Sequence, residues 1–304
     1  MDIEKVFKEL KEDIGIDKIL KNEPMSKHTS FKVGGSADIF IIPETIQDLK
    51  NIIIYARNNN CPLFIIGNGS NLIVKDRGIR GIVLEIFNNF KKTCIRDDII
   101  EAEAGILLSK LSNIAMKESL AGLEFASGIP GTLGGSIVMN AGAYGGQIST
   151  VVEQTEFIDF NGNINSLEKN QHNFGYRQSY FSHNQSIILK SKLKLAPSSK
   201  DKIKSLMDKL TSQRIEKQPL SFPSAGSVFK RPEGYFAGKL IEDAGLRGYS
   251  IGGAQVSEKH TGFIINKGGA TAKEIIKLIH IVQYEVKSKF GVDLETEVKI
   301  IGEE

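Results

Sequence analysis

One segment constrains the fold more than any other: residues 127–146 hold seven glycines in 20 positions. Glycine lets the backbone adopt left-handed conformations and approach a ligand closely, but each one also costs conformational entropy on folding. A purely structural loop rarely needs so many. Flexible linkers are also rich in glycine. Apolar residues are interleaved here, however, and they favour a packed segment that contacts a ligand: Ile129, Leu133, Ile137, Val138 and Met139.

A second glycine-containing loop directly follows the apolar run 63–66, and its residues are Gly67, Asn68, Gly69, Ser70, Asn71 and Leu72. Backbone N–H groups freed of side-chain obstruction can bind phosphate. A tight turn between two strands would have a similar sequence, so this loop alone leaves both interpretations open. A Rossmann site is disfavoured, because it needs a third glycine where Leu72 stands and a helix directly afterwards.

Composition excludes several classes of protein. With 304 residues, 40% of them hydrophobic and 25% charged, the chain is typical of a globular protein with two or three compact units. A net charge of +3 is too small to predict nucleic-acid binding. No apolar run approaches the roughly 18–20 residues of a membrane span, and the charged start lacks a secretory signal. We expect a cytoplasmic protein without nucleic-acid or membrane partners.

Metal binding is not predicted. Cys61 and Cys94 stand in unlike contexts, and the five histidines lack the spacing of metal ligands.

Hydrophobic periodicity predicts a mixture of helices and strands. We expect a helix over 3–14, then strands at 38–42, 63–66 and 82–86 with a helix opened by Thr45 between the first two. A strand at 99–104 and a helix over 107–119 follow. Asn161-Gly162 suits a type I′ turn and predicts a hairpin. A half-exposed strand covers 187–195.

The C-terminal third is predicted to be mainly helical. One helix uses Ile203, Leu206, Met207 and Leu210, and a short helix covers 236–244. In a longer helix, Thr271 and Glu274 form a capping box. Its buried stripe is Ile275, Leu278, Ile279, Val282 and Val286. A strand over 294–301 ends the chain. The pattern is α+β with several modules.

The two glycine loops, in this order, resemble the FAD-binding fold of vanillyl-alcohol oxidase and p-cresol methylhydroxylase. The chain as a whole resembles the family of UDP-N-acetylenolpyruvoylglucosamine reductases, and its short GYRQSYF segment and length resemble the shorter of two subtypes. Seven ordered blocks carry the resemblance: HTSFKVGGSADIF, GNGSNLIVKDRGIRGIV, GLEFASGIPGTLGGSIVMNAGAYGGQI, GYRQSYF, AGSVFKRP, GGAQVSEKHTGFIIN and LETEVKIIG.

The resemblance implies a three-domain α+β fold. Residues 1–86 plus 291–304 and residues 87–197 would bind FAD, and residues 198–290 would bind substrate. Besides Gly67 to Leu72, the implied FAD contacts are Gly128, Ile129, Pro130, Gly131, Thr132, Gly134, Gly135 and Asn140. Many oxidases of this fold tether the flavin through His or Cys. Residues 127–146 contain neither, so we expect non-covalent FAD.

The implied reaction reduces the enolpyruvyl ether of a UDP-sugar in peptidoglycan precursor synthesis. NADPH reduces FAD, flavin N5 gives hydride to the methylene carbon, and the adjacent carbon takes a proton. Arg177 matches the arginine that binds the substrate carboxylate, for which a planar guanidinium is suited. Ser227 matches the proton donor and Glu297 the catalytic acid. The residues alone leave a plainer alternative open for each: Arg177 as an ordinary surface arginine, Ser227 as a turn serine, and Glu297 as part of a solvated strand face.

Substrate contacts are implied for Tyr176, Arg214 and Lys217, and less directly for Lys230, Lys259 and His260. The resemblance is compatible with a monomer that acts on a small molecule. Two alternatives remain: an FAD-dependent alcohol oxidase or dehydrogenase of the same fold, and a non-catalytic nucleotide-binding module.

Overall fold

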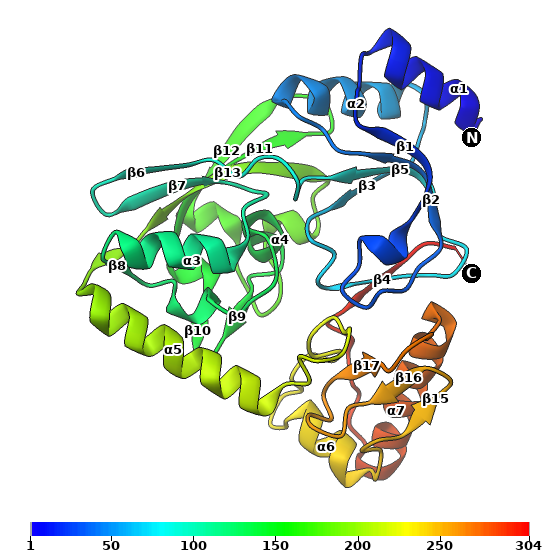
Figure 1. The fold of residues 1–304 in the computed structure, drawn as a ribbon, viewed down its shortest axis with the longest axis vertical. Coiled ribbons are helices and arrows are strands. Elements are labelled where there is room, and N and C mark those ends of the chain that lie inside the picture. The colour runs from blue at the N-terminus through cyan, green and yellow to red at the C-terminus, as the bar shows by residue number, and fades with distance from the viewer. Residues whose placement is uncertain (1, 304) are drawn as a thin grey trace. The chain divides into compact units, whose positions relative to one another are not determined.

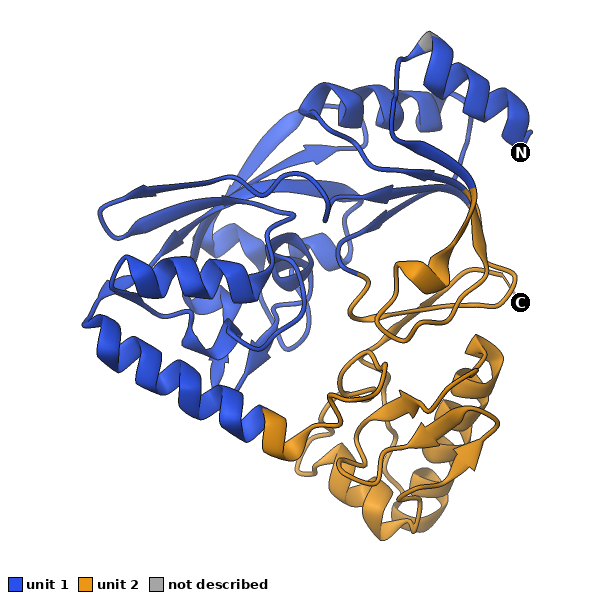
Figure 2. Cartoon of the chain, viewed as in Figure 1, with its two compact units in different colours: residues 1–21, 39–68, 81–214 blue, residues 22–38, 69–80, 215–304 orange. Residues whose placement is uncertain are grey.

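The computed structural model describes residues 2–303, and the chain divides into two compact units (Figure 2). Unit 1 comprises residues 1–21, 39–68 and 81–214. Unit 2 comprises residues 22–38, 69–80 and 215–304. Each unit has its own buried apolar cluster. The division into three domains stays a prediction.

The first sheet has four strands in the order β1-β2-β5-β3 (Figure 1). Their bounds are β1 Ile19–Pro24, β2 Ser36–Ile41, β5 Ile79–Glu85 and β3 Leu63–Ile66. β3 and β5 are parallel, as expected of strands joined by crossovers. The intervening helix α2 (Ile46–Asn58) begins at Thr45, which forms a capping box with Asp48. The sequence predicted all of these elements except β1.

The N-terminal helix is confirmed in its extent but changes its hydrogen bonding halfway. α1 (Ile3–Lys8) continues as a π-helical turn over Glu9–Asp13. Val6 and Leu10 keep their place in the core of unit 1 through this change.

The larger sheet of unit 1 is antiparallel, in the order β12-β11-β13-β7-β6. Its strands are β12 Ile164–Glu168, β11 Val152–Asp159, β13 Ser186–Lys194, β7 Ile99–Glu103 and β6 Thr93–Arg96. The hairpin between β11 and β12 is present, but the prediction of a type I′ turn was wrong. Gly162 has a positive φ of 85° while Asn161 does not, and Asp159 bonds Asn163, which leaves a three-residue loop.

Three helices complete unit 1 (Figure 1): α3 Leu108–Lys117, α4 Leu133–Val138 and the first part of α5 Lys200–Lys217. α4 lies inside the glycine-rich segment, so that segment is packed rather than a flexible linker. In α5, only Ile203 and Met207 of the predicted apolar face are buried. Leu206 is 44% exposed, because only a narrow stripe of this helix, with Ile203 and Met207, is buried. Short two-residue strands fill the remainder: β8 Leu120–Ala121, β9 Gly142–Ala143, β10 Gly146–Gln147 and β14 Ala196–Pro197.

Unit 2 combines a three-stranded antiparallel sheet with two helices. The sheet order is β15-β16-β17, and the elements are β15 Ser250–Ile251, β16 Ala254–Val256, β17 Ile264–Asn266, α6 Ala237–Asp243 and α7 Ala272–Phe290. The predicted apolar stripe of α7 is buried throughout. Besides its capping box, α7 is capped by Asp76, whose carboxylate accepts the backbone N–H groups of Ala272 at 2.8 Å and Lys273 at 2.9 Å.

The C-terminal strand is shorter than predicted. β18 covers only Lys299–Ile301 and pairs in parallel with β4 (Leu72–Val74). The residues before it form a single bridge, between Phe229 and Thr296. No helix among residues 2–303 is long and apolar enough to cross a bilayer.

Candidate functional site

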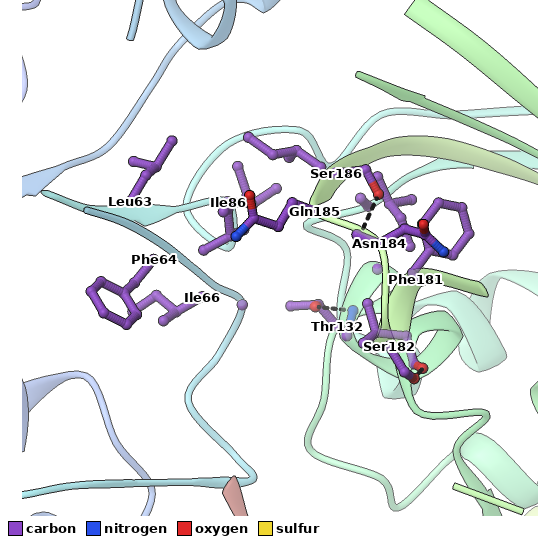
Figure 3. A pocket seen from close by; sticks show the side chains of 18 of the residues that line it. Leu63, Phe64, Ile66, Ile86, Thr132, Phe181, Ser182, Asn184, Gln185 and Ser186 are labelled. Atoms are coloured by element: carbon purple, nitrogen blue, oxygen red, sulfur yellow. Dashed lines mark hydrogen bonds between the residues drawn. The ribbon is translucent and has the colours of Figure 1, made fainter. Parts of the chain in front are cut away.

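A cavity of about 390 Å³ lies in unit 1 between β3, the start of α4 and residues 181–188 (Figure 3). Leu63 and Ile66 of β3 line it on one side, and Phe181 lines it on the other (Figure 3). Gly67 of the first glycine loop lines the same cavity as Thr132, Gly134 and Gly135 of the second. Its volume is in the range of small-molecule sites.

The two glycine loops approach each other closely at this cavity. A Cβ added to Gly67 would lie 2.6 Å from Oγ1 of Thr132, so any side chain at this position would displace Thr132 or the first loop. Thr132 is the N-cap of α4 and accepts the backbone N–H of Gly135 at 3.2 Å. Asn68 donates from Nδ2 to the carbonyl of Pro130 at 2.7 Å. The two glycine loops are therefore in direct contact at the edge of the cavity, where the N–H of Gly134 is bonded to the carbonyl of Ala104 at 2.9 Å.

A cation lies against the second loop. A Cβ at Gly128 would lie 2.8 Å from Cδ of Arg214, which extends from α5. Burial lowers the pKa of this guanidinium, and nearby Tyr144 raises it. An arginine stays charged after such a shift. Arg214 thus brings a partly desolvated positive charge to the glycine-rich backbone.

Arg177 is at the tip of a tight turn. Gly175 and Gln178 exchange two backbone hydrogen bonds of 3.1 and 3.4 Å, and Arg177 has a φ of 58°. This left-handed conformation costs about 1–2 kcal/mol for a residue with a side chain. The guanidinium donates to the carbonyl of Gly142 at 3.4 Å and lies 5.0 Å from the centre of the Tyr176 ring.

Asn140 holds this turn in place. Its Nδ2 donates to the carbonyl of Gly175 at 2.9 Å, and its Oδ1 accepts the backbone N–H of Ser149 at 3.2 Å. Two serines attach the other end of the turn to α4, since Ser179 and Ser182 both donate to the carbonyl of Val138. The direct FAD contact predicted for Asn140 stays a prediction.

Unit 2 brings Ser227 and Glu297 together, although 70 positions separate them in the sequence. The backbone N–H of Glu297 donates to the carbonyl of Val228 at 2.7 Å. The Ser227 hydroxyl donates to the carbonyl of Phe229 at 3.2 Å, with the Gly262 carbonyl at 3.5 Å. Glu297 is half-buried, whereas the Glu295 side chain is 73% exposed. The structure therefore distinguishes the two carboxylates by environment.

Asn71 and Lys230 have partners around this pair. Asn71 donates from Nδ2 to the carbonyl of Glu297 at 3.0 Å, and its own carbonyl accepts the N–H of Lys299 at 3.0 Å. The Lys230 ammonium pairs with Glu295. Gly69, with a φ of 58°, packs against the carbonyl of His28, and Leu72 begins β4. These contacts attach the first glycine loop to the segment that carries Glu297.

His260 lies beside Ser227. A Cβ at Gly262 would lie 3.2 Å from Nδ1 of His260 and 3.5 Å from Oγ of Ser227. Nδ1 accepts the backbone N–H of Gly262 at 3.2 Å, so the neutral ring carries its proton on Nε2. Burial lowers the pKa of His260, with a smaller contribution from Arg247. Lys259 donates to the carbonyl of Ile215, and Lys217 is exposed near the end of α5.

The sequence did not single out residues 182–186, which belong to one wall of the cavity, or Asp76, which caps α7. Neither carries a local signal, because both act through tertiary contacts. His172 was also missed. It is fully buried five positions before Arg177, and its adjacency to the GYRQ turn was the one available signal.

Comparison with known proteins gives a consistent result. A family model described as "FAD binding domain" matches residues 37–168, and one described as "UDP-N-acetylenolpyruvoylglucosamine reductase, C-terminal domain" matches residues 218–301. The chain is 53% identical to UDP-N-acetylenolpyruvoylglucosamine reductase of Clostridioides difficile (strain 630), over 97% of this chain and 95% of that relative. Identity to the protein of that name from Clostridium botulinum (strain Okra / Type B1) is 55%, over 96% and 95%.

A solved structure agrees with these relatives. The UDP-N-acetylenolpyruvylglucosamine reductase from Thermus caldophilus is 31% identical, with a TM-score of 0.79 over 93% of this chain and 98% of that one.

Proposed function

The chain belongs to the family of UDP-N-acetylenolpyruvoylglucosamine reductases, and from this premise we propose how its own residues serve that reaction. The protein is an oxidoreductase with the α+β FAD-binding fold of this family. It uses FAD and NADPH in peptidoglycan precursor synthesis. When bound, FAD accepts a hydride from NADPH and supplies one to the double bond of the enolpyruvyl ether. The substrate class is a UDP-sugar.

Gly67, Thr132, Gly134 and Gly135 would hold the FAD. Three features of the chain fit such a ligand: a mainly apolar cavity, glycines whose added Cβ would meet neighbouring atoms, and a partly buried cation against the second loop. Ile129, Pro130 and Gly131 belong to the same loop and would present backbone groups. No His or Cys occurs in residues 127–146, which supports non-covalent binding.

Arg177 would bind the substrate carboxylate. Hydride addition to the enolpyruvyl group places negative charge on that carboxylate, and a guanidinium fixed in advance stabilises the charge as it develops. The tight turn and the Asn140 bond support this role, because they hold the arginine before substrate arrives. Arg214, Lys217, Tyr176 and, less directly, Lys230 would contact the rest of the substrate.

Ser227 would give the proton to the carbon beside the carboxylate, and Glu297 would hydrogen-bond the same developing charge as an acid. The observation that carries this assignment is the bond from the Glu297 N–H to the Val228 carbonyl, because it brings two remote candidates to adjacent positions. The Ser227 hydroxyl donates to backbone carbonyl oxygens, so it would exchange this hydrogen bond for the substrate carbon when it gives up its proton.

Anaerobic spectroscopy tests the assignment. Purified protein is expected to be yellow, to be bleached by NADPH, and to regain colour with the enolpyruvyl UDP-sugar. Reduction by an alcohol instead of NADPH would favour the oxidase alternative, and an absence of either half-reaction would favour the nucleotide-binding module. A cytoplasmic location and a monomeric state stay predictions of the sequence.

A further inference from the structure

His172 is a fully buried polar side chain of unit 1 that the proposed reaction does not use. It ends a short 3-10 helix, Lys169–His172, five positions before Arg177. Its Nδ1 lies 3.0 and 3.2 Å from the carbonyl oxygens of Glu168 and Lys169. Carbonyl oxygens only accept, so Nδ1 carries the ring proton.

The other ring nitrogen is tied to the large sheet. Nε2 lies 2.8 Å from Oγ1 of Thr155 on β11, and this oxygen lies 3.0 Å from Oγ of Ser191 on β13. Ser191 also donates to the carbonyl of Gln154 at 2.7 Å. With its proton on Nδ1, the neutral ring accepts the Thr155 hydroxyl at Nε2. The sheet therefore fixes both the position and the tautomer of the ring.

The same ring contacts aromatic side chains on either side of the arginine turn. The His172 ring stacks on Phe174, with centroids 5.0 Å apart and planes 7° apart, and Phe174 directly precedes Gly175. Beyond the turn, Phe181 meets the His172 ring edge-on at 6.1 Å and 64°. Phe174, directly before residues 175–178, and Phe181, three positions after them, thus pack on one imidazole that hydrogen bonds hold to the sheet.

The turn needs such support. Arg177 has a left-handed backbone, and its conformation persists only if the surroundings determine it. We propose that His172 is a positioning residue for Arg177, acting through Phe174 and the turn. This inference rests on the proposed role of Arg177. A small displacement of a group that binds the transition state lowers the rate steeply, so loss of the ring should slow the step that uses Arg177.

The test measures the two half-reactions of the purified holoenzyme separately. In His172→Ala, reoxidation of the reduced flavin by the enolpyruvyl UDP-sugar is expected to slow by about 10- to 100-fold. His172→Phe keeps the stack on Phe174 and should restore part of that rate. The matched control is Phe157→Leu, because Phe157 packs edge-on against Phe181 at 5.3 Å and belongs to the same core without preceding the turn.

A double-mutant cycle separates positioning from a merely structural role. With Arg177→Ala as background, His172→Ala should cause no further loss in the reoxidation rate, since the group being positioned is gone. Equal effects in both backgrounds, or a loss in His172→Ala no greater than in Phe157→Leu, would overturn the proposal.

Misfolding of the variant and failure of the proposed function can be told apart from failure of the inference about His172. If His172→Ala does not fold, the same cycle is run with Thr155→Val, which keeps the volume of the site and removes the hydrogen bond to Nε2 of His172. If the wild-type reduced flavin is not reoxidised by the enolpyruvyl UDP-sugar, the proposed function fails. In that case, the inference about His172 fails with it.

Discussion

Replacing Gly67 by alanine tests whether the two glycine loops form one cradle. Gly67 does not have a positive φ, so alanine causes no backbone strain and its effect is purely steric. The new Cβ would lie 2.6 Å from Oγ1 of Thr132, whereas ordinary contacts begin at 3.4 Å. The Thr132 side chain or the first loop must move, and both belong to the proposed FAD site.

The size of the effect follows from the bond that is displaced. Thr132 caps α4 by accepting the N–H of Gly135. Losing an N-cap of this kind costs about 1 kcal/mol of stability. Gly67→Ala should therefore cost about 1 kcal/mol, and Thr132→Ala about the same. The double variant should also lose only about 1 kcal/mol, because removing the threonine removes both the clash and the bond.

Urea unfolding with and without saturating FAD measures these free energies, and flavin fluorescence measures the affinity. Affinity should fall in Gly67→Ala and recover partly in the double variant. Gly145→Ala is the matched control, because Gly145 has a φ of 85° with nothing within 4 Å of an added Cβ and so tests strain without crowding. Strictly additive losses in the double variant would refute the idea that Gly67 and Thr132 share one tightly packed space.

Three further predictions concern the chemistry and the stability of the chain. Ser227→Ala should keep flavin reduction by NADPH and abolish reduction of the sugar, while equal loss of both rates in stopped-flow spectroscopy would contradict the assignment. Asp76→Ala should lower the unfolding free energy by about 1–2 kcal/mol in urea titrations, because it removes both carboxylate bonds to the start of α7. Burial lowers the pKa of His172 and His260, so the unfolded chain binds these protons first as pH falls. Stability should therefore decrease below about pH 6.5, and His172→Phe should reduce that slope in unfolding measured from about pH 8 to about pH 5.

Local patterns predicted most elements of the fold. The Thr271–Glu274 box, the apolar stripe of α7 and the run 63–66 each specify a structure through neighbouring residues, and all three are confirmed. The strand β1 was missed, because its mixture of polar residues gives no alternation and its place depends on pairing within the sheet. The turn type after β11 was wrong, because an Asn-Gly pair also fits a longer loop when Asp159 bonds Asn163.

The candidate site was predictable only as separate pieces. The residue types of Arg177, Ser227 and Glu297 suit the chemistry, but surface arginines, turn serines and exposed glutamates look the same in a sequence. What distinguishes Glu297 from Glu295 is tertiary: one is half-buried beside Val228, and the other is exposed and pairs with Lys230. No periodicity encodes that difference, so the order of the motifs along the chain was needed to select between them.

Two of the three asparagines of the glycine loops, Asn140 and Asn71, show how such a site is held together. Each would have been expected to donate its amide to a ligand, yet Asn140 donates to the carbonyl of Gly175 and Asn71 to the carbonyl of Glu297. In each unit, therefore, a loop proposed to hold the cofactor is also bonded to a segment proposed to carry out chemistry. A loop whose amide fixes a neighbouring backbone loses conformational freedom before any ligand binds, which lowers the entropy cost of binding. It follows that replacing Asn140 or Asn71 by alanine should slow the reoxidation half-reaction even at saturating FAD. If these asparagines served cofactor binding alone, added FAD would restore the rate.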